Sequence, residues 1–269
     1  MRTAPLTSRP GPSFATRAAW TVAIGLVLAG LVGCGATPKK REELHEQAEF
    51  HYQLALGHWR AQEAPVAIQE LNKTLELEPD HKLALYLLGF IYQGRFNYAE
   101  TERLYRRALA VDPDWHEVSN NLGTVYLAQE RWDEAEEIFR RLADTATYAT
   151  PGHAYNNLGW AVFQQGRASE ALEYFLLATR FQPALCLAYN NQGIAYERLG
   201  NARSAVEAYN EAVTRCAEYQ EPLFRLAMLL LSLNRDIDRA EDLLEKCIEI
   251  GRESTFGRRC YEYVNPDTW

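Results

Sequence analysis

The chain has no excess of basic residues. Its 28 Lys and Arg are outnumbered by 36 Asp and Glu, which gives a formal net charge of −8 over 269 residues. Binding to nucleic acid depends on clustered cations that neutralise phosphates, so this balance argues against a nucleic-acid partner. The acids and bases are mixed along the chain, a pattern typical of solvated helix faces.

The sequence also lacks the usual marks of an enzyme. It contains no phosphate-binding loop, no dinucleotide-binding fingerprint, and no HExxH or GxSxG motif. Of its six histidines, His51 and His58 are two helical turns apart, which is a poor spacing for a shared metal ion. We therefore expect a protein with no catalytic residues, no cofactor, no metal and no small-molecule substrate.

The N-terminal apolar run is short. It extends from Ala18 to Val32, which is less than the roughly 20 residues that span a bilayer as a helix. Three arginines precede it, Arg2, Arg9 and Arg17. A basic segment followed by a short apolar run is the pattern of a secretory signal peptide, which we predict for residues 1–33.

The end of this segment indicates its type. Leu31-Val32-Gly33-Cys34 resembles the lipobox of bacterial lipoproteins, in which the cysteine is acylated and becomes the first residue of the mature protein. The resemblance implies a lipid anchor on Cys34, with several acyl chains that together hold a protein firmly to a membrane. Gly35 rather than Asp follows, which in that class favours the outer membrane and predicts a location on its periplasmic face. The alternative is an ordinary apolar anchor with a chance cysteine.

One layout recurs six times between residues 48 and 254. Its period is about 34 residues, the length of a tetratricopeptide helix pair. The two clearest copies are Leu85, Leu88, Gly89, Tyr92, Tyr105, Ala108 and Pro113, and Tyr155, Leu158, Gly159, Ala171, Phe175, Ala178 and Pro183. We therefore predict an all-α fold, a right-handed superhelical solenoid of about six tetratricopeptide (TPR) repeats with a C-terminal capping helix.

The spacing also predicts the boundaries of the repeats. A lipid-anchored tether and the start of the first helix, near Glu43, occupy residues 34–47. The repeats cover 48–81, 82–115, 116–151, 152–185, 186–220 and 221–254, and a capping helix and tail cover 255–269. Repeat three is two residues longer than the period, which predicts a bulging loop at residues 144–151 before repeat four.

Besides Cys34 the chain has four cysteines, Cys186, Cys216, Cys247 and Cys260. In an exported protein they can form disulfides, with three possible connectivities. Cys186 would open the fifth helix pair and Cys216 would close it, so this pairing is geometrically reasonable and leaves Cys247 with Cys260. The alternative is four reduced cysteines in the core.

Two sets of side chains are candidates for binding a protein partner. Asn121, Asn157 and Asn191 occupy one position of successive first helices, where a row of amides can hold the backbone of an extended peptide. Alternatively, these asparagines link neighbouring pairs.

The second set is aromatic and should be partly exposed in the same groove, where exposed rings mark an interface. It consists of Tyr52, Trp59, Tyr86, Phe90, Trp160 and Phe163. The groove offers no Lys, and only Arg225, to clamp a terminal carboxylate.

The centre of the chain resembles one family. Asn120-Asn121-Leu122-Gly123, the long loop ending in Tyr148-Ala149-Thr150-Pro151 and the return to Asn156-Asn157-Leu158-Gly159 resemble the type IV pilus biogenesis lipoproteins, the PilF/PilW/Tgl pilotins. Some members carry cysteines where this chain has Leu127 and Phe163, so their disulfides do not transfer. The resemblance implies an outer-membrane lipoprotein that binds secretin subunits and promotes their insertion and multimerisation. The alternative is a general periplasmic scaffold for peptidoglycan enzymes or outer-membrane assembly factors.

Overall fold

The computed structural model describes residues 37–266, which form helices joined by short turns. The predicted signal peptide, Cys34 and residues 267–269 lie outside the described residues. The helices form six antiparallel pairs and a final helix: α2 (Pro38–Arg60) with α3 (Ala64–Leu77), α4 (Lys82–Gly94) with α5 (Tyr98–Val111), α6 (His116–Ala128) with α7 (Trp132–Ala143), α8 (Pro151–Gln164) with α9 (Ala168–Phe181), α10 (Cys186–Arg198) with α11 (Ala202–Arg215), α12 (Gln220–Ser232) with α13 (Ile237–Gly251), and α14 (Thr255–Val264).

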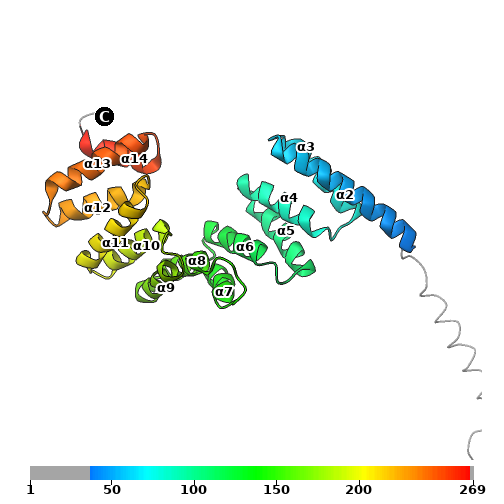
Figure 1. The fold of residues 1–269 in the computed structure, drawn as a ribbon, viewed down its shortest axis with the longest axis horizontal. Coiled ribbons are helices and arrows are strands. Elements are labelled where there is room, and N and C mark those ends of the chain that lie inside the picture. Colours follow the sequence, from blue (N-terminus) through cyan, green and yellow to red (C-terminus); the bar gives the residue numbers. More distant parts are fainter. Residues whose placement is uncertain (1–36, 267–269) are drawn as a thin grey trace, which may run out of the picture.

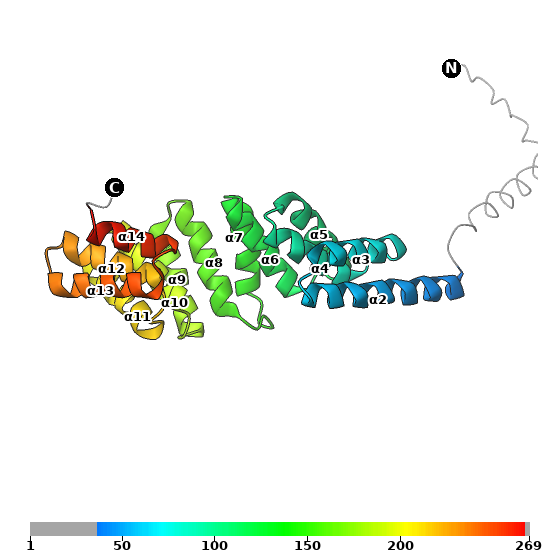
Figure 2. The ribbon, with the colours of Figure 1, turned by 90° about the horizontal axis from the view of Figure 1, so that it is seen from above.

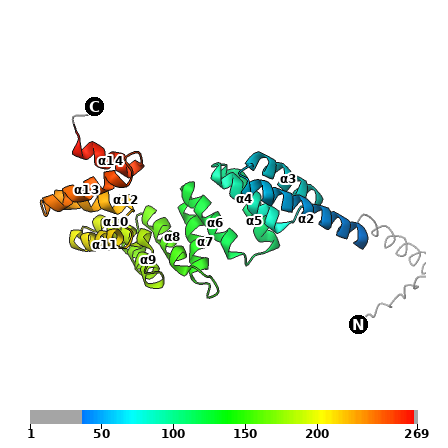
Figure 3. The ribbon, with the colours of Figure 1, turned by 45° about the horizontal axis from the view of Figure 1, so that its top comes forward.

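The pairs stack into an open arc (Figure 1). The first helices α6, α8 and α10 lie on the inner side of the arc, and their partners α7, α9 and α11 lie on the outer side. Helix α14 packs against α12 and α13 at the C-terminal end (Figure 3). The predicted all-α TPR solenoid with a capping helix is therefore confirmed. No helix between residues 37 and 266 has the length and apolar character needed to cross a bilayer.

The first helix begins earlier than predicted. It starts at Pro38 rather than near Glu43, and Figure 2 shows it projecting beyond its partner α3. The Thr37 hydroxyl accepts a hydrogen bond from the Lys40 amide at 3.3 Å, which caps the helix. Proline is well suited to the first helical position because its missing N–H has no partner there in any case. The described part of the segment predicted as a lipid-anchored tether is therefore mostly a helical extension.

Each of the second to fifth pairs is held by a glycine that faces an aromatic ring. Gly89 of α4 lies against Tyr105 of α5, and a Cβ on this glycine would lie 2.6 Å from the ring. Gly123 meets Phe139 in the same way, also at 2.6 Å. The contact recurs at Gly159 with Phe175 and at Gly193 with Tyr209, and all four rings are fully buried. The ring thus occupies the space that the absent side chain leaves, which fixes the separation of the two helices.

Charged hydrogen bonds connect repeat three to repeat four, the two repeats that the long junction separates. We call this set of bonds the Glu136 brace. Helix α7 ends at Ala143 and α8 begins at Pro151, so a loop occupies the segment where the bulge was predicted. The Glu136 carboxylate on α7 accepts hydrogen bonds from Arg167 at 2.9 and 3.1 Å, from Arg140 at 2.7 Å and from Gln165 at 2.9 Å. Burial alone would raise the pKa of Glu136, but these donors lower it to about 2. The brace therefore joins helix α7 to the turn between α8 and α9 while the carboxylate is ionised.

Both predicted cysteine pairs are bonded in the structure. Cys186 begins α10 and Cys216 follows α11, with Cα atoms 6.2 Å apart. Cys247 on α13 is joined to Cys260 on α14, with Cα atoms 6.3 Å apart, and both are fully buried. The first bridge closes the fifth pair, and the second fastens the capping helix to the last repeat.

Changing Gly123 to Ala should lower the free energy of unfolding by about 1–3 kcal/mol, because the new methyl would meet the fully buried Phe139 ring. Gly57→Ala is the matched control, since nothing lies within 4 Å of the added Cβ in α2. This variant should be neutral or more stable by up to about 1 kcal/mol. Denaturant unfolding measures both, and equal effects would contradict the packing argument.

Changing Glu136 to Gln should destabilise the protein by about 1–2 kcal/mol at neutral pH, because the three donors lose their charged acceptor. The folded-state pKa is depressed, so this stabilisation is present above about pH 4.5 and is lost as the pH falls towards 2. The difference between wild type and variant should therefore shrink over that interval. Glu137→Gln is the control, since Glu137 and its partner Arg141 are both about three-quarters exposed and should contribute little.

Thiol labelling in denaturant without reductant should leave Cys186, Cys216, Cys247 and Cys260 unmodified, because all four are in disulfides. After reduction, four additional labels should be found by mass spectrometry. Labelling of all four before reduction would refute both bridges. On a chain-entropy argument each bridge contributes about 3 kcal/mol, so reduction should also lower the unfolding midpoint.

Candidate functional site

The inner face of the first three repeats carries a cluster of aromatic rings. We define the aromatic surface as the four residues Trp59, Tyr86, Phe90 and Trp115. The ring centroid of Phe90 lies 6.2 Å from that of Trp59 and 6.3 Å from that of Tyr86, which in turn lies 5.1 Å from that of Trp115. Phe90 is 44% exposed and the other three are partly exposed. Rings that pack against each other and still face solvent are suited to burying an apolar segment of a partner.

Hydrogen bonds and charge fix the centre of the aromatic surface. The Tyr86 hydroxyl donates to the Glu117 carboxylate at 2.6 Å, and burial together with Glu117 raises the pKa of Tyr86 to about 12. The Lys82 ammonium lies 5.5 Å from the Trp115 ring centroid and bonds to Asp112 at 2.8 Å. The rings are thus held in place before any partner arrives. Sequence reasoning missed Trp115, which belongs to the turn before α6.

Two of the predicted aromatic residues are not exposed, so that expectation was wrong for them. Tyr52 is 8% exposed because it packs against His81, with the two ring centroids 4.9 Å apart. Phe163 is 7% exposed because it stacks on Trp160, with centroids 5.7 Å apart, and lies under the Arg198 guanidinium. Both residues support neighbouring side chains instead of presenting a surface. Trp160 remains partly exposed, as predicted.

The three predicted asparagines do not form a free row along the groove. The Asn191 amide donates to Asn156 of the preceding repeat at 2.9 Å, and Asn191 is 4% exposed. The Asn121 amide lies 3.5 Å from the Tyr86 hydroxyl, again one repeat back. Both contacts join residues 35 apart in sequence. They match the alternative in which asparagine links successive pairs.

Asn157 departs from this pattern. By analogy with the other two links, the partner of Asn157 one repeat back would be Asn120. The two extra junction residues place Asn120 37 positions before Asn157 instead of 35. Asn157 Oδ1 instead accepts from the Asn156 amide at 3.3 Å, and Asn120 Oδ1 is buried without a partner among the described residues. Asn157 is partly exposed, and among residues 37–266 its own amide group has no hydrogen-bond acceptor.

A cavity of about 430 Å³ opens on the inner face of the last three repeats. We call it the inner cavity, and it is lined by Asn156, Asn157, Trp160, Leu187, Asn191, Glu221 and Arg225. All seven lie on α8, α10 and α12, the first helices of repeats four to six. Arg225 Nε donates to Glu221 at 2.8 Å. The cavity therefore combines amides, one ion pair and two apolar side chains. Sequence reasoning did not propose four of these as binding residues: Asn156, Leu187, Glu221 and Arg225.

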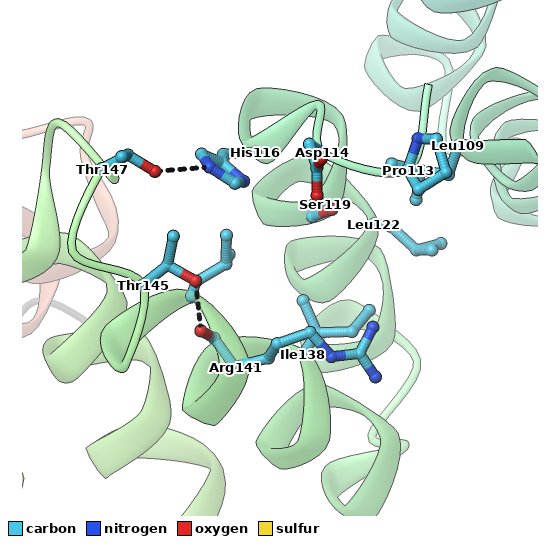
Figure 4. Close-up of a pocket in the computed structure, with 11 residues that line it drawn as sticks. Leu109, Pro113, Asp114, His116, Ser119, Leu122, Ile138, Arg141, Thr145 and Thr147 are labelled. Carbon is cyan, nitrogen blue, oxygen red and sulfur yellow. Dashed lines mark hydrogen bonds between the residues drawn. The ribbon is translucent and has the colours of Figure 1, made fainter. Parts of the chain in front are cut away.

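A second cavity, of about 410 Å³, lies beside the long junction loop (Figure 4). Leu109, Leu122 and Ile138 provide apolar walls, and Thr145 and Thr147 of the loop close it. The loop is pinned there, since Thr147 Oγ1 lies 3.3 Å from the ring of His116 and Thr145 Oγ1 donates to a main-chain carbonyl on α7 at 2.8 Å. The walls of this cavity come from α5, α6 and α7 and from the turns that join these helices to their neighbours.

No cluster of three or more possible metal ligands occurs in the part of the chain that the structure describes. The titratable groups of the inner cavity, Glu221 and Arg225, are already paired with each other. The geometry of both inner-face regions is that of a surface for contacting another molecule.

Comparison with protein families identifies the repeats. Tetratricopeptide repeat profiles match residues 80–147, 115–184 and 187–219, about half of the chain together. A comparison with curated protein sequences gives no significant match.

Comparison with solved structures finds the same architecture in pilus proteins. PilW, described as a widely conserved type IV pilus biogenesis factor, matches with a TM-score of 0.67 and 23% identity, over 80% of this chain and 98% of its own. The Pseudomonas aeruginosa PilF structure matches with a TM-score of 0.66 and 21% identity, over 83% of this chain and 99% of its own. The anaphase-promoting-complex assembly Cut9–Hcn1 matches with a TM-score of 0.63 and 15% identity, over 81% of this chain and 42% of that one.

Identities this low establish a shared fold. The matches to PilW and PilF extend over nearly the whole of those two proteins, whereas the match to Cut9 covers less than half of it. Repeat profiles, helix pairs and these structures agree, and the chain belongs to the tetratricopeptide repeat family.

Proposed function

We propose that this protein is a pilotin: a lipoprotein on the periplasmic face of the outer membrane that binds secretin subunits and promotes their insertion and multimerisation for type IV pilus assembly. The observation that carries the proposal is the aromatic surface on the first three repeats, within a solenoid of the same extent as PilW and PilF. No catalytic role is part of the proposal.

The aromatic surface suits a protein partner. Trp59 and Phe90 present large apolar area on rigid side chains, which lose little conformational entropy on binding. The absence of an excess of cations favours a polypeptide over a nucleic acid.

The position of this surface suits an anchored protein. In the proposal the lipid is attached at Cys34, and the helical extension at the start of α2 connects it to the first repeat. A tether of this kind raises the local concentration of the groove at the membrane where the secretin inserts, without adding a contact.

Changing Trp59 and Phe90 together to Ala should abolish or strongly reduce secretin oligomers in cells, because the exposed part of the aromatic surface is removed. Both residues are at least partly exposed, so the variant should fold and reach the same membrane fraction. Secretin oligomers can be measured by their resistance to dissociation in detergent gels, and the fold by circular dichroism.

Phe96→Ala is the matched control. Phe96 belongs to repeat two, as Phe90 does, and is 77% exposed. It lies in the turn between α4 and α5, outside the aromatic surface. It should leave oligomers unchanged. Normal oligomers in the Trp59/Phe90 variant would exclude this surface. Crosslinking in cells that captures peptidoglycan enzymes or assembly factors but no secretin would replace the pilotin role with that of a general periplasmic scaffold.

A further inference from the structure

We infer that the exposed side of helix α2 pairs with the same side of α2 in a second copy of this chain, so that two solenoids join at their N-terminal ends. The two helices pack antiparallel about a two-fold axis. The inference concerns the end of the arc rather than its inner face, and it does not depend on the pilotin role.

Three residues on one side of α2 form a surface that we call the end face: Phe50, Leu54 and Gly57. Their spacing of four and three residues places them in one line along the helix. Phe50 is 61% exposed and Leu54 is 38% exposed, although both are apolar. No atom lies within 4 Å of the position that a Cβ on Gly57 would occupy. The end face is therefore apolar and open in the described chain.

The same positions are covered in the next two repeats. The residues that follow the end face by one and by two periods of 34 are all at most 4% exposed. They are Ala84, Leu88 and Ile91 in α4, and Val118, Leu122 and Val125 in α6. The difference is that α4 and α6 each have a preceding repeat, whereas α2 is the first helix that the structure describes. The end face thus has the character of an internal packing surface.

The two ends of the solenoid are treated differently. At the C-terminal end, α14 packs against α12 and α13 and closes the stack. Terminal repeats usually carry a polar outer face, which keeps a solenoid soluble. The first repeat instead keeps Phe50 and Leu54, so a helix from another molecule can pack where a preceding repeat would stand.

The end face is complementary to itself. A two-fold axis at residue 52 of an antiparallel pair places Phe50 of each copy opposite Leu54 of the other. The same operation places Arg60 of each copy beside Glu46 of the other, because the two residues lie eight and six positions from the axis. Both are exposed, and the 3.6-residue period puts them on the same flank of the end face. One apolar centre and two ion pairs therefore arise from a single symmetric arrangement.

The charges near the end face favour a second copy over a lipid surface. Glu43 and Glu46 continue the line of Phe50 towards the start of α2, and both are exposed. A lipid surface on the end face would bring these carboxylates against the head groups and the acyl boundary, where they lose hydration without gaining a partner. A second copy places the guanidinium of Arg60 beside Glu46.

The pair leaves the aromatic surface open. Trp59 lies nine positions from Phe50, which is half a turn and thus the opposite side of α2. Helix α2 also projects beyond α3, which lengthens the side available to a second copy (Figure 2). A single helix pair buries less area than the roughly 1,200–2,000 Å² of a standard interface, so we expect a dissociation constant of about 1–100 µM.

Sedimentation velocity tests the inference on the chain from Gly35 onward, which keeps every described helix and carries no lipid. The protein should shift from monomer to dimer between about 1 and 200 µM. Phe50→Glu should stay monomeric over this range, because it places a carboxylate from each copy in the apolar centre. Phe96→Glu is the matched control, since Phe96 is 77% exposed in the turn between α4 and α5, and it should dimerise as the wild type does. Circular dichroism checks the fold.

A charge exchange tests the ion pairs. Arg60→Glu and Glu46→Arg should each raise the dissociation constant at least about threefold, because like charges then face each other across the interface. The double variant should return to within about twofold of the wild type, since the pair is restored with its signs reversed.

Cysteine crosslinking tests the direction of the helices. Cys186, Cys216, Cys247 and Cys260 are in disulfides, so an added cysteine is the free thiol of the chain from Gly35 onward. Positions 47 and 57 are equally far from the two-fold axis. Oxidation of an equal mixture of Gln47→Cys and Gly57→Cys chains should therefore give mixed dimers in excess of either homodimer.

A protein that stays monomeric at 200 µM would overturn the inference, as would a dimer that survives Phe50→Glu or a Gly57→Cys chain that crosslinks mainly to itself. Flotation of a monomeric protein with vesicles of phosphatidylethanolamine and phosphatidylglycerol, lost in Phe50→Glu, would assign the end face to a lipid surface instead. Secretin oligomers are a separate measurement, because the pilotin role depends on the aromatic surface.

Discussion

The contact on which the rest of the structure depends joins a glycine of the first helix to an aromatic ring of its partner in the four central pairs. Gly89 and Tyr105 show the reason: the ring fills the space where a Cβ would stand, so neither residue can change size alone. The same contact in the next three pairs gives four helix pairs of nearly equal geometry. Equal units stack into a regular arc, and the arc creates an inner face. The binding surfaces therefore follow from a packing constraint that is itself fully buried.

The inner face is uneven because the period is broken once. Two extra residues before Pro151 move Asn157 out of step with Asn120, and the link that joins repeats two and three, and repeats four and five, is absent there. The Glu136 brace bridges the same junction on the outer side with charged hydrogen bonds. The irregularity thus leaves an amide free on the inner face while ion pairs hold the neighbouring helices in position.

The sequence was sufficient to predict whatever depends on spacing. The 34-residue period predicted the succession of helix pairs and placed Cys186 at the start and Cys216 at the end of one pair. Exposure depends on neighbours in three dimensions, which is why Tyr52 was mispredicted: His81, from the turn before the next repeat, covers it.

Some features that were missed did have a signal in the sequence. Arg225, which was missed as a site residue, follows the predicted Asn157 and Asn191 at the same spacing of 34 residues, so the three share one face of successive helices. Thr37 and Pro38 form a recognisable start of a helix. The spacing of Glu221 and Arg225, four residues apart with opposite charge on one helix, likewise indicates their ion pair.

The two halves of the inner face would contribute to the free energy of binding through different interactions. Around Phe90 the surface is apolar and its contribution would scale with the area removed from water, with little demand on orientation. In the inner cavity the amides and the guanidinium act only at defined distances and directions, and a polar group that is buried without a partner there costs free energy. The first repeats therefore favour an apolar segment of a partner, whereas the last three repeats favour a segment whose polar groups match the amides and the ion pair of the cavity.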